Sequence, residues 1–263
     1  MSVGHIIAAG LVSIVAGLLG SLLGLGGGLF VTPMLSGPLG MPVHRAVAAS
    51  IVAVIATSSA GGSGYLKRGV PNVRLGMLLE TGTVIGAIAG TLLGGTLSPR
   101  VLSGIFAVVL VYTAFSLLRG SKERTVAADP LAKWLGLGDT YAIGHIRLGL
   151  VISVLAGVVS GLLGVGGGIV LVPAMVALMG VPLKIATATS TFMIGITGVA
   201  SAAIQVQRGN VDPILAAPVI LGIFIGASLG PRVAPKITPK MLRIFFLIAI
   251  GLSIVEMAQK AIA

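Results

Sequence analysis

Two stretches of this chain, 140 positions apart, have nearly the same sequence, and this duplication constrains the fold more than any other feature. Residues 17–33 and 157–173 are identical at eight of 17 positions without a gap, and both contain the motif Gly-x-Gly-Gly-Gly-x₄-Pro. The same register continues as far as Ser50 and Ser190. Glycines, prolines and a serine in fixed register indicate an internal duplication. In membrane transporters, apolar segments interrupted by glycine at corresponding positions of two halves point to the substrate site.

The composition predicts an all-α integral membrane protein. Hydrophobic residues make up 56% of the chain and charged residues 9%, against roughly 25% charged in soluble domains. The mean hydropathy is +1.13. Because backbone groups cannot hydrogen-bond to lipid, repeated apolar runs indicate a multi-pass helical bundle in a lipid bilayer. The net charge of +11 would suggest nucleic acid in a soluble protein. Here it is assigned to orienting loops, and no nucleic-acid partner is expected.

Each half is predicted to contain five apolar segments. The expected ranges are 3–24, 28–40, 45–66, 73–96 and 101–118, then 147–165, 168–180, 184–206, 213–231 and 241–258. The second segment of each half is too short to cross a bilayer, so the first two are expected to form a broken, partly re-entrant hairpin with the glycine cluster at its turn. The predicted domains are a membrane repeat over 1–118, a cytoplasmic connector over 119–146 and a second membrane repeat over 147–263.

A hairpin that returns to its starting side leaves an odd number of crossings in each half, so the second half enters from the opposite face. This inverted-repeat model divides Lys and Arg 13 to 4 between the two sides, whereas parallel repeats would divide them 10 to 7. The positive-inside rule favours the inverted model, with both termini outside. It places Gly69 and Lys122 in the cytoplasm, and Arg100 and Gly209 outside.

The connector between the halves contains the sequence Asp129-Pro130, which resembles a helix start. A short helix carrying Lys133 and Trp134 is therefore expected at the membrane interface, where indole rings prefer to lie. We interpret the segment as a connector rather than a regulatory element.

The glycine clusters are predicted to bind an anion through backbone N–H groups. Glycine permits positive φ and close approach, and N–H groups at the start of a half-helix form a positive concavity. Two such turns brought face to face would hold an anion without a buried cation, which is costly in a membrane. The alternative is that the glycines only permit tight helix packing. Neither cluster is a nucleotide motif. The predicted site residues are Gly26, Gly27, Gly28, Gly166, Gly167 and Gly168, and alanine at Gly27 and at Gly167 is expected to cause similar damage.

Ser50, Thr189 and Ser190 follow the hairpins and are candidate ligand contacts. The alternative is that their hydroxyls bond to carbonyls of their own helices. Glycines also recur at every fourth position, which lines one helix face with glycine and allows close contact. Packing within the protomer is favoured, and a homodimer interface is the alternative. These glycines are Gly82, Gly86, Gly90 and Gly94, and Gly222, Gly226 and Gly230.

Glu80 is the only acid well inside an apolar segment, so it is a candidate for proton or sodium coupling. Two observations favour a structural role instead. The second half has no acid at the corresponding place, and Arg74 is near enough in sequence to pair with Glu80. Substitution by glutamine is therefore expected to leave at least part of the transport intact.

The glycine run, the following proline, the Gly-x-Pro turn and the Ala-x-Ser of the third segment resemble the TauE/SafE family of sulfite exporters, in both halves. The resemblance implies secondary transport of small sulfur-containing anions, such as sulfite or sulfonates, across a bacterial inner membrane. No cofactor is expected. A cation or metal carrier is an alternative, although a chain without cysteine and with three histidines offers few ligands and no metal site is predicted. A non-transporting membrane scaffold is another. No enzyme is expected, since no Ser–His or paired-carboxylate arrangement is apparent.

Overall fold

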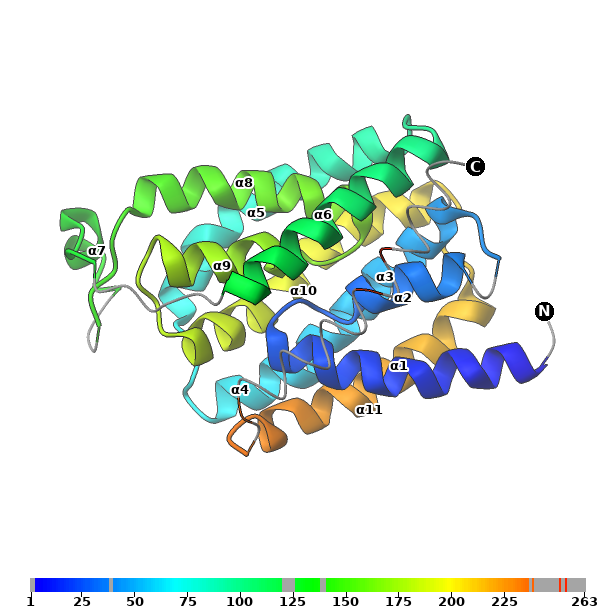
Figure 1. Ribbon diagram of the computed structural model, residues 1–263, viewed down its shortest axis with the longest axis horizontal. Coiled ribbons are helices and arrows are strands. Elements are labelled where there is room, and N and C mark those ends of the chain that lie inside the picture. The colour runs from blue at the N-terminus through cyan, green and yellow to red at the C-terminus, as the bar shows by residue number, and fades with distance from the viewer. Residues whose placement is uncertain are drawn as a thin grey trace.

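The computed structural model describes residues 3–37, 40–119, 126–137, 141–236, 238, 251 and 254. Every regular element among these residues is a helix, and most lie along the long axis of the molecule (Figure 1). The helices of the first half are α1 (Val3–Leu23), α2 (Gly28–Ser36), α3 (Val43–Thr57), η1 (Ser58–Gly62), α4 (Ser63–Lys67), α5 (Val73–Gly94) and α6 (Pro99–Arg119). The remainder are α7 (Pro130–Trp134), α8 (Ile146–Leu163), α9 (Gly168–Ala177), α10 (Leu183–Gln207) and α11 (Pro213–Val233).

Five stretches of helix in the described part are long and apolar enough to cross a membrane. They are Val43–Lys67, Val73–Gly94, Ile146–Leu163, Leu183–Gln207 and Ala216–Val233. The predicted helical membrane fold is therefore confirmed. The tenth predicted segment, 241–258, lies almost entirely outside the described residues.

The two halves exchange partners across the molecule. Helix α5 of the first half packs along α8 of the second, and α11 of the second half packs in the same way along α1 of the first. Glycines make both contacts close: Gly86 and Gly90 lie against the carbonyls of Val154 and Val158, and Gly226 lies against that of Ile14. The predicted use of the glycine faces for packing within the protomer is confirmed, and a homodimer stays a prediction.

The equivalent long helices of the two halves run antiparallel where they meet. Gly62, late in the stretch 43–67, lies against Phe192, early in α10. Ile55, which comes before Gly62, lies against Gly198, which comes after Phe192. By contrast, α5 and α10 run parallel, since Asn72 contacts Thr189 and a later turn of α5 contacts Arg208. The stretch 43–67 and its counterpart α10 therefore run in opposite directions.

One local feature distinguishes the halves. The stretch 43–67 contains a π-helical turn, η1, whereas its counterpart α10 is α-helical throughout.

The connector contains the expected short helix α7, which lies at one end of the molecule (Figure 1). Its start is capped as predicted, because Asp129 accepts the Leu131 N–H with one carboxylate oxygen and the Ile146 N–H with the other. Trp134 is exposed.

Candidate functional site

The two glycine turns meet, fully buried, between the halves. Helix α1 ends at Leu23 and α2 begins at Gly28, while α8 ends at Leu163 and α9 begins at Gly168. The Cα of Gly28 lies so close to the carbonyl oxygen of Gly164 that a Cβ atom would overlap it. Gly168 has the same relation to the carbonyl oxygen of Gly24. The two copies of the duplicated motif therefore meet at one place, at the ends of two half-length helices.

Ser50 and Ser190 connect each turn to the opposite half. The Ser50 hydroxyl lies 2.7 Å from the carbonyl oxygen of Gly164 and 3.0 Å from that of Gly28. The Ser190 hydroxyl donates to the carbonyl of Gly24 at 2.5 Å. Both side chains are fully buried. The expected alternative, a bond to their own helix, is wrong for both: each holds the main chain of a glycine turn in the other half.

The two turns differ in backbone conformation at their central glycine. Gly167 has φ +69°, in the left-handed region that favours glycine, whereas Gly27 has φ −64°, which any residue adopts. A Cβ at Gly27 would first meet the terminal methyl of Ile223, a group that can move. In place of the similar damage expected from the sequence, we therefore expect alanine to be tolerated better at Gly27 than at Gly167. The pair under matched constraint is Gly28 and Gly168, each packed against main chain of the other half.

Threonines that the sequence analysis did not select also hold the turns. The Gly27 N–H donates to the hydroxyl of Thr57 at 3.2 Å. Thr32 donates to the carbonyl of Leu163, and Thr191 to that of Ser21. Thr189 is not at the centre, because its hydroxyl accepts the Asn72 N–H at the start of α5. Thr57 could have been found from the repeat, since Thr197 matches it at the same offset.

The electrostatics of this centre come from the backbone. Gly28 and Leu29 open α2, and Ile169 lies in the first turn of α9, so their N–H groups have no acceptor within their helices. The positive ends of two helix dipoles therefore point toward the middle of the molecule. No Lys or Arg is buried among the residues whose burial is described. The positive partial charge at this centre therefore comes from backbone N–H groups rather than from a cationic side chain.

Glu80 is 4% exposed on α5, and it is the one buried charged residue in that part of the chain. The hydroxyl of Thr83 donates to one carboxylate oxygen at 2.8 Å, and that of Thr197 donates to the other at 2.5 Å. Arg74 instead donates to the carbonyl of Gly136. The expected pairing of Arg74 with Glu80 is therefore wrong, and the carboxylate lies among hydroxyl groups.

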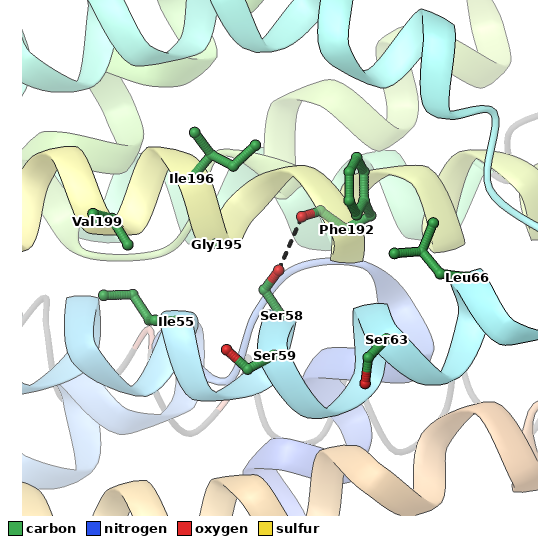
Figure 2. A pocket seen from close by; sticks show the side chains of 9 residues that line it. All are labelled: Ile55, Ser58, Ser59, Ser63, Leu66, Phe192, Gly195, Ile196 and Val199. Atoms are coloured by element: carbon green, nitrogen blue, oxygen red, sulfur yellow. Dashed lines mark hydrogen bonds between the residues drawn. The ribbon is translucent and has the colours of Figure 1, made fainter.

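A groove of about 330 Å³ lies between the stretch 43–67 and α10 (Figure 2). Ser58, one of its lining residues, donates a hydrogen bond across the helix interface to the carbonyl of Phe192. None of the predicted site residues lines this groove. Apolar side chains dominate its wall, which suits a lipid chain better than an anion. The lining residues are Ile55, Ser58, Ser59, Ser63, Leu66, Phe192, Gly195, Ile196 and Val199.

Comparisons with known proteins agree with a membrane transporter. The family model described as "Sulfite exporter TauE/SafE" matches residues 9–257. The chain is 27% identical over 221 residues to the "Probable membrane transporter protein YunE" of Bacillus subtilis, covering 80% of this chain and 81% of the relative. It is 26% identical over 216 residues to a "Probable membrane transporter protein" of Xylella fastidiosa, covering 82% and 78%. It is also 27% identical over 199 residues to the "Probable membrane transporter protein MJ0441" of Methanocaldococcus jannaschii, covering 72% and 68%. No solved structure matches the chain significantly.

Proposed function

We propose, from the premise that this chain belongs to the TauE/SafE sulfite exporter family, that it is a secondary transporter of small sulfur-containing anions such as sulfite or organosulfonates. The protein is a multi-pass membrane transporter. We also infer an anionic substrate, alternating access and a place in the cell inner membrane.

The observation that carries the proposal is the buried meeting of two half-helix N-termini. A site made of backbone N–H groups attracts a compact oxyanion with several acceptor oxygens. It avoids the cost of a cation in the bilayer, which is at least about 2.5 kcal/mol at the helix centre. Because both turns are buried and in contact, an anion enters only when the two halves move relative to each other.

The antiparallel contact between the stretch 43–67 and α10 supports alternating access between inverted halves. The exchanged pairs α5–α8 and α1–α11 each combine one helix from either half, so each pair can move as a rigid unit. When the equivalent helices of an inverted repeat exchange conformations, the opening passes from one side of the membrane to the other. The serine contacts to the opposite turns, made by Ser50 and Ser190, are the bonds that this exchange would remake.

Residues Lys67 and Gln207 test the inverted orientation, because they are equivalent by the 140-residue offset and both are exposed. Lys67 is near the start of α5, whereas Arg208, the neighbour of Gln207, donates to Thr91 and Leu92 near the end of α5. Because α5 has 22 residues, its two ends lie about 33 Å apart. We expect Lys67→Cys to react with a membrane-impermeant maleimide only from the cytoplasm and Gln207→Cys only from outside. The chain contains no cysteine, so each variant carries a single thiol. Labelling of both from one side would refute the inverted model.

Transport in proteoliposomes tests the function itself. Purified protein should exchange labelled sulfite faster than protein-free vesicles, and sulfoacetate should compete for that exchange. Chloride is the matched control, because it offers one acceptor atom rather than several oxygens. Exchange of neither sulfite nor sulfoacetate would remove the sulfur-anion assignment, and equal competition by chloride would remove the oxyanion geometry.

A further inference from the structure

The Glu80 cluster has no cationic partner in the described helices. Helix α5 packs chiefly against α8 and α10, whose charged residues Arg147, Lys184 and Arg208 are all exposed at helix ends. Arg208 is bonded to the main chain of α5 eleven residues beyond Glu80, which is about 16 Å along the helix. Arg74, on α5 itself, donates to Gly136. A buried carboxylate without a cation is stabilised when a proton makes it neutral.

The cluster exists in one half only. At the 140-residue offset, Ile220 takes the place of Glu80 and Ile223 that of Thr83, whereas Thr57 matches Thr197. The shared threonine therefore has two different partners: Thr57 accepts the N–H of Gly27, while Thr197 donates to Glu80. The two turns also differ in backbone conformation, since Gly27 lies in the right-handed region and Gly167 in the left-handed region.

Helix α8 connects the cluster to the second glycine turn. Gly157 lies against the main-chain carbonyl of Thr83, and the adjacent Ala156 has its carbonyl 3.3 Å from the Cβ position of Gly167. A change in the bonding of Thr83 or Thr197 therefore acts next to the turn. A negative charge on Glu80 would also repel an anion held there.

A second, independent observation lies one turn along α10. Ser201 is 1% exposed and its hydroxyl has no hydrogen-bond partner. Thr197, Ser201 and Gln205 are spaced by four residues, so they share one face of the helix. Gln205 bonds to Asn210 in the turn that ends the helix. The counterparts of Ser201 and Gln205 in the first half are Gly61 and Tyr65, so this row of polar groups also occurs once.

We propose that Glu80, with Thr83 and Thr197, is the proton-binding site of this transporter, and that Ser201 and Gln205 relay the proton between this site and the 208–212 turn. The inference rests on the proposed anion transport. A proton from that side adds to a carboxylate oxygen of Glu80 and removes its charge, which favours an anion at the neighbouring turn. It also weakens the charge-assisted bond from Thr197. Thr197 then accepts the N–H of Gly167, as Thr57 accepts that of Gly27.

Infrared spectroscopy tests the proton site without any substrate. In reconstituted wild-type protein, the C=O stretching band of a protonated buried carboxyl should appear on acidification and be absent from Glu80→Gln. Thr197→Val should shift this band, because it removes one hydrogen bond, whereas the equivalent Thr57→Val should not. Asp129→Asn is the control for a carboxylate outside this path, since Asp129 caps α7. The same band in Glu80→Gln and wild type would overturn the inference, even if anion transport were established.

Transport measurements in proteoliposomes distinguish proton coupling from anion binding. With protein-free vesicles subtracted, we expect an acid-outside pH gradient to drive labelled sulfite into wild-type proteoliposomes and to drive none through Glu80→Gln. Sulfite exchange without a gradient should persist in this variant, because exchange requires no net proton movement. Gradient-driven uptake by Glu80→Gln, loss of its exchange, or a wild type driven by sodium instead would each overturn the proposal. A wild type that moves no sulfite would refute the proposed function and leave the infrared result to decide the proton site.

Discussion

Alanine at Gly28 or at Gly168 is expected to abolish anion transport. The added methyl group at Gly28 would overlap the carbonyl oxygen of Gly164 and crowd the Ser50 hydroxyl, and at Gly168 it would overlap that of Gly24 and crowd Ser190. Because the obstructing atoms are main chain, the two turns must separate. We expect each variant to lose sulfite exchange in proteoliposomes and to lose about 1–3 kcal/mol of stability, as overpacking of a buried contact does.

The matched control is Gly27→Ala, one residue earlier on the same turn. Its backbone is already in the right-handed region and its first obstacle is the mobile end of Ile223. It should keep a large part of the exchange activity and should melt close to wild type. Gly167→Ala should fall between these variants, because a left-handed φ strains alanine by about 1 kcal/mol. Wild-type exchange in a folded Gly28→Ala, Gly168→Ala double mutant would remove the glycine turns from the mechanism.

The duplication predicted much of this fold because it depends on local properties of the chain. A run of three glycines strongly disfavours a continuous helix, so residues 24–27 and 164–167 are expected to end one helix and start another. The short segments after them, α2 and α9, are limited by the proline and glycine signals that follow. The spacing of Gly82, Gly86 and Gly90 likewise predicted a helix face in close contact.

The hydrogen-bond partners that connect the two halves could not be predicted from the sequence in the same way. The register shows that Ser50 and Ser190 are equivalent, but a hydroxyl in a membrane helix can reach its own helix or a neighbour with similar geometry. Only the packing of the two halves brings Ser50 to Gly164. The asymmetry of the site was hidden for a related reason. The identical letters at Gly27 and Gly167 have different φ values, and the threonines beside them have different partners, since Thr57 bonds to one turn while its counterpart Thr197 bonds to Glu80.

The second large effect is expected on stability rather than on substrate affinity. Alanine at Gly86 would overlap the carbonyl of Val154, and alanine at Gly226 that of Ile14, so the helix pairs α5–α8 and α1–α11 would each be forced apart. Overpacking of this kind costs about 1–3 kcal/mol. We expect both variants to show a lower Tm in detergent, while the folded fraction keeps its affinity for sulfite. Gly94→Ala is the matched control on the same face of α5, because its Cβ would lie 3.6 Å from Leu162, an ordinary van der Waals contact. It should melt like the wild type. A wild-type Tm for Gly86→Ala, or a changed sulfite affinity at an unchanged Tm, would show that this face acts in substrate binding rather than in packing.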